Sequence, residues 1–519
     1  MVDIPSLQLL EAGCTLLPCS RLYTTLHQST TMATTAPPFG DLIRILRVSD
    51  LKDDNKLKDL AQIENLRTVT SYSWVDNARP GPKILVPGKP PLWTPQNSPY
   101  PLRQDSGSFF RDKNAARYPK HPTEPAVVAS LAADPILPIK LDIFACGSTL
   151  GNLLRFVRGQ DRTFRMLAYK IQNTVFLVRR ENSPTELIPD VRGYGHTFPE
   201  ANTTWEPEVK GSASHQRLIQ YTFGGLNIAV RFEADGYIKP RQPPKAKQPI
   251  PPPSSASPSL GDLTTALSTT TITPSTATTT APHKTTLTTA PAGILVPHTT
   301  LFDLKTRSTY ARHTKDHLAE ELPRLWVSQL PTLILAFHTR GLFLAADTEV
   351  RDVRGHVARW EAEHQGELVK LAGVLRWVRD VVGEVVGDGG GEGVEAVEIC
   401  RRVGSEDGDG RLELEVRRPG GVVGGVVSDG VRERWVRACR GGVGGGDDHG
   451  EKGGDRERRG DEEKRGDEEK GGAGEKTGDE NKGEGEKGVG GEVLEWAGGD
   501  DDDFTGCSEA CGYCGKCTY

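Results

Sequence analysis

The chain has 519 residues, including 58 Gly and 36 Pro, and its 64 Lys and Arg face 70 Asp and Glu for a net charge of -6. Much of the Gly and Pro lies in stretches that cannot bury a core, so the foldable part is much shorter than the chain and we expect one domain. The charge balance excludes a strong overall attraction to nucleic acid or to membranes, so any such contact must be a local patch.

The N-terminal segment shows no clear secretory signal, and no run of about 18 apolar residues that could span a bilayer occurs. We therefore expect neither a membrane protein nor a secreted one. Residues 1–37 are expected to be a dispensable or disordered extension, with Met32 as an alternative start and a weak transit peptide as the other interpretation. Most of the nine cysteines are scattered, which suits a reducing compartment, and we expect a nuclear or cytoplasmic protein.

Residues 38–240 should form the first part of the folded core. Between Asp41 and Leu66, apolar residues at near-helical spacing predict one or two short amphipathic helices. Between Ser71 and Pro119, prolines and aromatics alternate too densely for a helix or a central strand, which predicts an ordered wrapping segment. After Pro138 the pattern predicts a strand and a helix in LDIFACGSTLGNLLRFV, then strands in FRMLAYKI, TVFLVRR, RLIQYTF and LNIAVRFEADGYI.

Residues 241–298 are rich in Thr and Pro and are expected to be a disordered insert, because they hold too few large apolar residues to offset the entropy of ordering. Strand-like sequence resumes at TLFDLKTRS, so the insert interrupts the domain, and residues 299–382 form the second part of the core. A helix is predicted from Ala358 to Val381. The fold class expected is α+β (mixed), with a central mixed β-sheet flanked by helices.

The remaining residues divide into three segments. Residues 383–440 are Gly-rich, with a possible strand at RLELEVRR and a short helix at RERWVRA. Residues 441–503 mix both charge signs without apolar residues, which predicts a disordered tail whose protein partner is unknown. Residues 504–519 hold a cysteine cluster.

That cluster has the spacing C-x3-C-x2-C-x2-C, short enough for four thiolates to bind one ion such as Zn2+. An iron–sulfur cluster is a lesser alternative. The non-functional alternative is a tail that binds no metal. The candidate ligands are Cys507, Cys511, Cys514 and Cys517.

Two acidic triplets at the ends of apolar strands are the candidates for chemistry. Alternate strand residues share a face, so Glu233 and Asp235 present two carboxylates together, and Asp303 and Lys305 do the same while Leu304 turns inward. Carboxylates prefer hard divalent ions such as Mg2+ or Mn2+, which can stabilise displacement at phosphorus, and the lysine would orient or protonate near the phosphate. The alternative is a pair of exposed strands with ordinary outward charges.

The order of these segments resembles the nuclear decapping exoribonuclease family, whose members remove aberrant 5' ends from RNA. The segments that carry the resemblance are FACGSTLGNLLRF, FRMLAYKIQNTVFLVRRENSP, GYGHTFPEA, FGGLNIAVRFEADGY, LFDLKTRS and PTLILAFHTRG. The resemblance implies a restriction-endonuclease-like core and a site with two divalent ions. It assigns Glu233 and Asp235 to a Glu-x-Asp motif, and Asp303 and Lys305 to a Glu-x-Lys motif in which aspartate replaces glutamate.

The chain also departs from that family. Pro199 stands where the family has a glutamate, and Glu200, kept as a candidate metal ligand, follows one step late, where a strand would turn it to the other face. Gly147 stands near the place of a family arginine. Two functions therefore stay open: a metal-dependent phosphoesterase or pyrophosphohydrolase acting on RNA 5' ends, and a catalytically inactive RNA- or protein-binding module of the same fold.

A second resemblance is to an uncharacterised fungal family often labelled geranylgeranyl pyrophosphate synthetase. It is carried by SYSWVD, PLWTP, DSGSFFRDKNAARYP, FGGLNIAVRFEADGY and DFTGCSEACGYCGKC. The label is not supported by the residues, because a prenyl synthase needs two Asp-rich helical motifs facing each other in an all-helical bundle.

Basic side chains for a phosphate backbone are available in and after the predicted helix, although an ordinary solvated basic face is the preferred explanation of any one of them. They are Arg155, Arg158, Arg162, Arg165 and Lys170.

Overall fold

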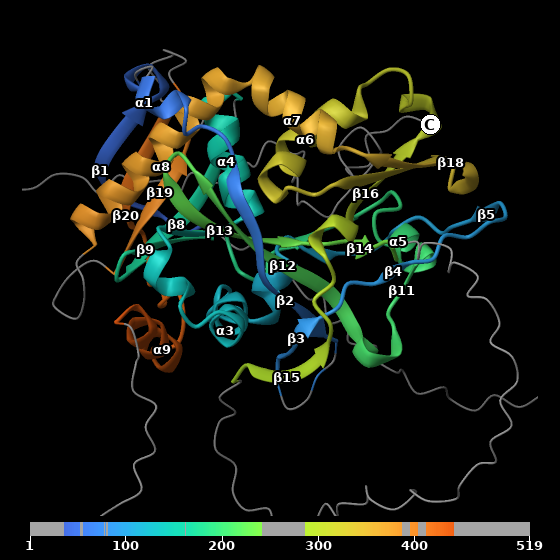
Figure 1. Ribbon diagram of the computed structural model, residues 1–519, viewed down its shortest axis with the longest axis horizontal. Coiled ribbons are helices and arrows are strands. Elements are labelled where there is room, and N and C mark those ends of the chain that lie inside the picture. The colour runs from blue at the N-terminus through green and yellow to red at the C-terminus, as the bar shows by residue number, and fades with distance from the viewer. Residues whose placement is uncertain are drawn as a thin grey trace, which may run out of the picture. The chain divides into compact units, whose positions relative to one another are not determined.

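The computed structural model describes residues 36–51, 55–76, 78, 81–160, 162–240, 286–386, 395–402 and 412–440. Within these residues, strands form two large mixed sheets and one two-stranded sheet, accompanied by α-helices (Figure 1). The predicted mixed α+β class is confirmed, and the all-helical bundle that a prenyl synthase requires is not what these residues form.

The first sheet has eleven strands. Strand β7 runs parallel to both of its neighbours and β15 runs parallel to β3, whereas the other neighbouring strands are antiparallel. In spatial order the strands are β1 (Phe39–Arg47), β20 (Glu413–Pro419), β19 (Ala396–Arg401), β8 (Phe164–Ile171), β9 (Thr174–Arg179), β7 (Ile143–Cys146), β13 (Leu226–Glu233), β12 (Ser212–Phe223), β2 (Glu64–Val75), β3 (Lys83–Gly88) and β15 (Thr288–Gly293).

The second sheet has seven strands, and β16 lies inside it between an antiparallel and a parallel neighbour. In spatial order its strands are β11 (Thr203–Thr204), β4 (Leu92–Trp93), β14 (Gly236–Tyr237), β16 (Leu301–Ser308), β17 (Thr332–Thr339), β18 (Leu342–Asp352) and β5 (Tyr100–Pro101). The two-stranded sheet pairs β6 (Phe109–Phe110) with β10 (Leu187–Ile188).

The α-helices of the described residues are α1 (Asn55–Lys58), α2 (Lys113–Arg117), α3 (Glu124–Ala133), α4 (Gly147–Val157), α5 (Thr197–Asn202), α6 (His317–Ser328), α7 (Arg354–Glu363), α8 (Gln365–Val385) and α9 (Asp429–Cys439). Short 3-10 helices occur at Val48–Asp50, Leu137–Lys140, Pro207–Val209, His298–Thr300 and Thr309–Ala311. None of these helices has both the length and the apolar character needed to cross a membrane.

Side-chain alternation along β8 shows how the first sheet is covered on both faces. Met166 and Ala168 pack into a core with α4, α6, α7 and α8, whereas Leu167 and Tyr169 pack into a second core with α3 and α9. Figure 1 shows α4 and α8 on one side of the sheet and α3 and α9 on the other. Because successive strand residues point to opposite faces, a strand that is apolar at every position needs cover on both sides.

The sequence prediction was wrong for residues 41–66, where β1 replaces most of the expected helix. Strand β1 pairs with β20, and its register shifts between Phe39 and Leu42 and between Leu42 and Arg44. Such bulges displace side chains from strict alternation, so the apolar spacing of this strand imitates a helix. The helical part that does form, α1, spans only Asn55–Lys58.

The wrapping segment expected from Ser71 begins later than predicted. Residues 71–75 complete β2, a strand of 12 residues that lies between β12 and β3 and buries Tyr72 and Trp74. The prolines that argued against a central strand start only at Pro80, after β2 has ended.

Strands from both sides of the Thr/Pro-rich insert pair with earlier or later parts of the core. Gly236 of β14 pairs with Phe302 of β16, and β15 pairs with β3. The expected disorder is therefore wrong for residues 288–298, whereas residues 241–285 lie outside the described residues. Strand β15 is an edge strand, where Pro291 costs no ladder hydrogen bond on its open side.

Residues 395–440 add two strands and a helix to the first sheet. The predicted strand at RLELEVRR corresponds to β20, and the predicted short helix corresponds to α9. Strand β19 was not predicted. The charged tail, the cysteine cluster and residues 1–35 lie outside the described residues.

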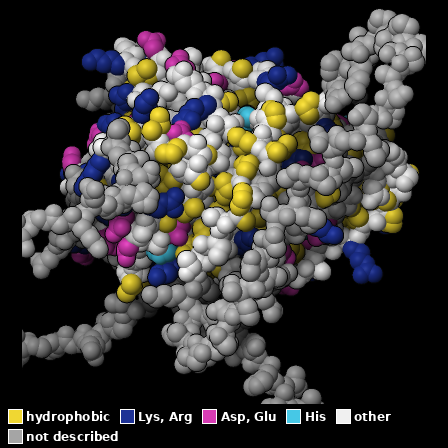
Figure 2. Space-filling view, turned by 60° about the horizontal axis from the view of Figure 1, so that its bottom comes forward, with side chains coloured by type: hydrophobic (Ala, Val, Ile, Leu, Met, Phe, Trp, Pro, Cys, Tyr) yellow, Lys and Arg dark blue, Asp and Glu magenta, His cyan; other side chains and the backbone are white. Residues whose placement is uncertain are grey.

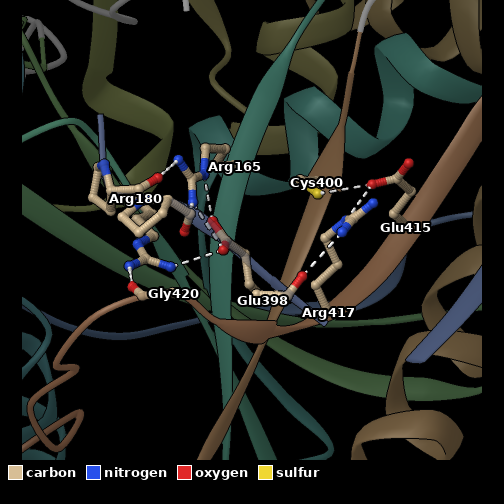
Figure 3. Close-up of polar contacts among 10 residues, drawn as sticks. Arg165, Arg180, Glu398, Cys400, Glu415, Arg417 and Gly420 are labelled. Carbon is tan, nitrogen blue, oxygen red and sulfur yellow. Dashed lines mark hydrogen bonds and ion pairs between the residues drawn. The ribbon is translucent and has the colours of Figure 1, made fainter. Parts of the chain in front are cut away.

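Strand β19 carries a fully buried carboxylate, Glu398, at the centre of an ionic cluster (Figure 3). Its oxygens accept hydrogen bonds from Arg165 Nε at 2.5 Å and Nη2 at 2.9 Å, and from Arg180 Nη1 at 2.8 Å. Arg180 also donates to the carbonyl of Gly420, and Arg165 to that of Pro37, each at 2.5 Å. Glu398 thus connects β8 to the end of β9 through Arg165 and Arg180. The same two arginines hold the segments before β1 and after β20.

Replacing this carboxylate tests how far the sheet depends on it. The substitution Glu398→Gln should lower the free energy of unfolding by about 3–5 kcal/mol, because it leaves two buried guanidinium groups without a negative partner. Urea unfolding followed by circular dichroism measures this loss. The matched control is Glu384→Gln, whose side chain is 59% exposed in an ion pair with Arg44 and which should change stability by no more than about 0.5 kcal/mol. Equal effects of the two substitutions would contradict the central role of Glu398.

Candidate functional site

The chain passes from the first sheet to the second between Glu233 and Gly236. Strand β13 ends at Glu233, and β14 begins at Gly236 in the other sheet. The Ala234 amide donates to the carbonyl of His215 at 2.9 Å, whereas the Asp235 Oδ2 atom accepts the amide of Leu304 at 2.7 Å. Neighbouring residues are therefore held by different sheets.

This crossing places Asp235 beside the second acidic triplet. Because Gly236 pairs with Phe302 in an antiparallel register, Asp235 continues that register to a position opposite Asp303, and opposite residues share a face. Asp303 is 1% exposed and Lys305 is 4% exposed. On the other face, Leu304 packs in an apolar cluster with Phe198 of α5. The structure thus brings Asp235, Asp303 and Lys305 together, and the burial of Asp303 and Lys305 argues against ordinary outward charges.

Helix α6 covers this face of the second sheet and places an arginine on it. Arg324 forms an ion pair with Asp303 and a second one with Glu321 at 3.1 Å. Glu321 in turn accepts a hydrogen bond from Arg307 at 2.9 Å. The side chains of Arg324 and Glu321 are 11% and 10% exposed, so these charges are paired away from bulk water.

Helix α2 supplies a further cation. The ammonium nitrogen of Lys113 lies 3.5 Å from His196 Nδ1, and the positive charge of Lys113 acts to lower the pKa of Asp235. Burial, with a contribution from Lys113, lowers the pKa of His196 to about 3, and the ring stacks on Phe109. We call Asp235, Asp303, Lys305, Arg324 and Lys113 the junction site.

The ionisation of Asp235 reflects opposing effects. Burial raises its pKa, while the charges of Lys305 and Arg324 and the hydrogen bond from the Leu304 amide act to lower it, and the net shift is upward. Desolvation penalises the charged form of a carboxyl group, so three nearby cations do not fully compensate for the loss of water.

The ammonium of Lys305 has no hydrogen-bond partner among the described residues. Buried polar groups are normally hydrogen-bonded, and an ammonium left without partners is costly. This group is therefore suited to receive an acceptor from a bound molecule.

Two of the proposed metal ligands are not brought to the junction site. Glu233 pairs with Gln216 in the first sheet and accepts a hydrogen bond from it at 3.3 Å. Glu200 is exposed on α5, a short helix where the family resemblance anticipated a strand. No group of three or more His, Cys, Asp or Glu side chains in the described part of the chain is arranged to hold a metal ion.

The donor set of the junction site does not fit the two divalent ions that the family resemblance implies. Its carboxylates are Asp235 and Asp303, with Glu321 beside them, and both Asp303 and Glu321 are already paired with Arg324. A cation entering here would meet the charges of Arg324, Lys305 and Lys113. Mg2+ and Mn2+ favour sites rich in carboxylate and water oxygens, so both the ligand count and the charge oppose their binding. The four candidate zinc ligands, Cys507, Cys511, Cys514 and Cys517, lie outside the described residues.

Gly147 stands near the position where the decapping exoribonuclease family has an arginine. In this chain Arg231, from another strand, provides positive charge there. Arg231 pairs in register with Cys146, the residue before α4, and donates to Gln216 at 2.9 Å. Burial opposes ionisation of the Cys146 thiol, but Arg231 and the hydroxyls of Ser148 and Thr149 lower its pKa overall.

Sequence reasoning missed Lys113 and Arg324. Lys113 belongs to the proline- and aromatic-rich segment, in which no site was expected. Arg324 lies three residues after Glu321 on the buried side of an amphipathic helix, and a charged pair at this spacing on an apolar face was the available signal.

The family model for the domain of unknown function DUF8563 matches residues 52–398. No curated protein sequence matches the chain. Three solved structures are similar in part: S. pombe Rai1, Scheffersomyces stipitis Rai1 in complex with (3'-NADP)+ and calcium ion, and Candida albicans Rai1 in complex with pU5-Mn2+.

The sequence identities to these three structures are 10%, 9% and 9%, and the TM-scores are 0.43, 0.45 and 0.42. The alignments cover 72%, 76% and 78% of this chain and 99%, 100% and 99% of the respective structures. At these TM-scores the likeness carries no conclusion about this chain.

The raised pKa of Asp235 predicts a pH-dependent effect of Asp235→Asn. A carboxyl group whose pKa is higher in the folded state binds more protons there, so it costs stability as the pH rises from its unfolded value through its folded value. Asn can still accept the Leu304 amide without that cost. The substitution should therefore be close to neutral below pH 4 and increasingly stabilising towards pH 7, where the gain should reach roughly 1 kcal/mol or more.

Urea unfolding of both proteins at several pH values measures the difference. The opposite trend, in which Asp235→Asn is progressively destabilising above pH 4, would show that the surrounding cations outweigh burial.

Proposed function

The chain belongs to the DUF8563 family, and we propose that its core is a binding module for phosphorylated RNA 5' ends that lacks hydrolytic activity. The RNA 5' end is proposed as the ligand because the sequence resembles the nuclear decapping exoribonuclease family. The same resemblance also supplies the proposed restriction-endonuclease-like arrangement of the core. Of the two functions that the sequence left open, the charge of the junction site supports the binding module.

The observation that carries the proposal is the excess of cations at the junction site. Lys113, Lys305, Arg307 and Arg324 face three carboxylates, those of Asp235, Asp303 and Glu321. The Lys305 ammonium has no hydrogen-bond partner among the described residues. Such a site favours a phosphate oxygen, which would complete the charge balance, over a divalent cation, which would increase the imbalance.

A pocket of about 550 Å³ beside the second sheet offers room for a ligand close to this site. It includes Leu335, which pairs in parallel register with Lys305. Its lining contains Arg312, Lys315 and Arg351 together with Asp316 and Glu349, and both arginines form ion pairs with Glu349. The pocket therefore supplies room beside the site, whereas the excess of cations lies at the junction site itself.

A second candidate function is the metal-dependent phosphoesterase or pyrophosphohydrolase. The observation in its favour is the placement of Asp235 opposite Asp303 with Lys305 on the same face. This function requires a different arrangement of side chains. Glu233 and, by the family resemblance, Glu200 would have to join Asp235 and Asp303, and Arg324 would have to release Asp303. A zinc ion on the C-terminal cysteines and a nuclear or cytoplasmic location remain further proposals.

Binding and hydrolysis of RNA separate the two candidates. The full-length protein should show no hydrolysis of 5'-triphosphate or capped RNA with or without Mn2+. In fluorescence anisotropy it should bind a 5'-triphosphate RNA more tightly than the same RNA with a 5'-hydroxyl. Hydrolysis that requires Mn2+ and is lost in Asp235→Asn would overturn the binding module and favour the enzyme.

Two variants test the site itself. Lys305→Met removes the unpartnered ammonium while keeping the side-chain length, and Lys113→Gln removes a half-buried charge. Each should weaken binding of the triphosphate RNA by roughly tenfold or more, the value of a hydrogen bond to a charged group. Lys58→Gln, an exposed substitution on α1, is the control and should have little effect. If Lys305→Met retains the full preference for the triphosphate, the junction site is not where the 5' end binds.

A further inference from the structure

A second concentration of arginines lies away from the junction site, between α4 and the ends of β8 and β9. It lines a pocket with five arginines and a single carboxylate, Glu181. The lining residues are Ser148, Asn152, Arg155, Arg162, Thr163, Phe164, Arg165, Arg179, Arg180 and Glu181. None of them belongs to the junction site.

Two of these arginines are held rigidly by the interior of the protein. Arg165 is 5% exposed and Arg180 is 9% exposed, and both bind the fully buried Glu398 (Figure 3). Arg165 also lies against the Phe39 ring, with its guanidinium carbon 4.2 Å from the ring centre. One carboxylate therefore serves two guanidinium groups, which leaves an excess positive charge behind the pocket.

The other three arginines come from the rim. Arg155 on α4 donates to Asn152 Oδ1 at 2.7 Å, Arg162 precedes β8, and Arg179 forms an ion pair with Glu181. Burial raises the pKa of Glu181, and the charges of Arg179 and Arg111 act against that shift. Five arginines thus surround a pocket whose lining holds one carboxylate.

The size of the pocket limits what can enter. Its cavity volume is about 30 Å³, which is room for one or two water-sized groups. A nucleobase is therefore excluded, whereas one or two oxygens of a phosphate group can enter while the rest of the group stays at the mouth of the pocket. The planar fork of a guanidinium group matches two oxygens of a phosphate and stays charged at neutral pH.

We propose that this pocket binds one phosphate group, as a second anion site independent of the junction site. The surface around it does not explain such binding by itself. On the face shown in Figure 2, Lys and Arg side chains lie among Asp, Glu and hydrophobic side chains, in keeping with a net charge of -6 for the whole chain. The attraction is local, so it depends on these particular arginines.

The first source of such a group is inorganic phosphate, and the second is the phosphate of an RNA chain. Isothermal titration of the full-length protein with sodium phosphate tests binding, with sodium chloride at equal ionic strength as the reference. We expect saturable binding of phosphate and none of chloride. Failure to bind phosphate, or equal heats for both salts, would overturn the proposal.

The double substitution Arg155→Gln with Arg162→Gln removes two charges from the rim and leaves the buried Arg165, Arg180 and Glu398 intact. It should weaken phosphate binding by roughly tenfold or more, and circular dichroism checks that the variant is folded. Arg44→Gln is the matched control, since Arg44 is a half-exposed arginine outside the pocket. Phosphate binding that is equal in the double variant and in the wild type would place the ion elsewhere and contradict the proposal.

A 5'-hydroxyl RNA pentamer, which has internal phosphates only, distinguishes the two sources. If the pocket serves an RNA phosphate, the double substitution weakens binding of this RNA and sodium phosphate competes with it. If the pocket serves free phosphate, the double substitution affects the titration with phosphate alone. Because these variants leave Lys113, Lys305 and Arg324 unchanged, a failure here is separate from a failure of the junction site.

Discussion

The crossing of the chain between two sheets at Ala234 and Asp235 is the constraint on which the arrangement of the junction site depends. The Ala234 amide is bound to the first sheet, and the Asp235 carboxylate is bound to the Leu304 amide of the second. A carboxylate that serves as a structural acceptor cannot move freely. Asp235 is thereby held opposite Asp303, while Glu233, only two residues earlier, remains in the first sheet beside Gln216.

Two buried carboxylates, Asp303 and Glu398, are paired with arginines, and that pairing shapes both proposed sites. Asp303 is paired with Arg324 under α6, and Glu398 is shared by Arg165 and Arg180. A charge removed from water requires such a partner, because its desolvation is otherwise too costly. At both places the arginines and lysines exceed the acids. Both proposed sites are therefore expected to prefer phosphate. Acidic residues without these cations would instead favour a metal ion.

Several elements could be predicted because their residues carry a local pattern. The β-branched and aromatic residues of β8, β9 and β13 predicted strands. The stripe through Trp360, Leu368 and Leu375 predicted the helical region that the structure divides into α7 and α8. Strands β1 and β15 could not be predicted in this way. Each is ordered by pairing with a segment far away in the chain, and the bulges of β1 and the Thr/Pro composition of β15 hide that pairing.

The sequence by itself determined the mixed α+β class and the common face of Asp303 and Lys305, because period-two alternation is a local property of a strand. Only the tertiary structure decided that Glu233 stays in the first sheet while Asp235 binds the second, that Arg324 pairs with Asp303, and that the charge of Lys113 acts on Asp235. The free energy of a buried charge depends on which groups surround it in space, and those groups come from β13, β16, α2 and α6. Their meeting follows from how the sheets and helices pack, which no short stretch of the chain encodes.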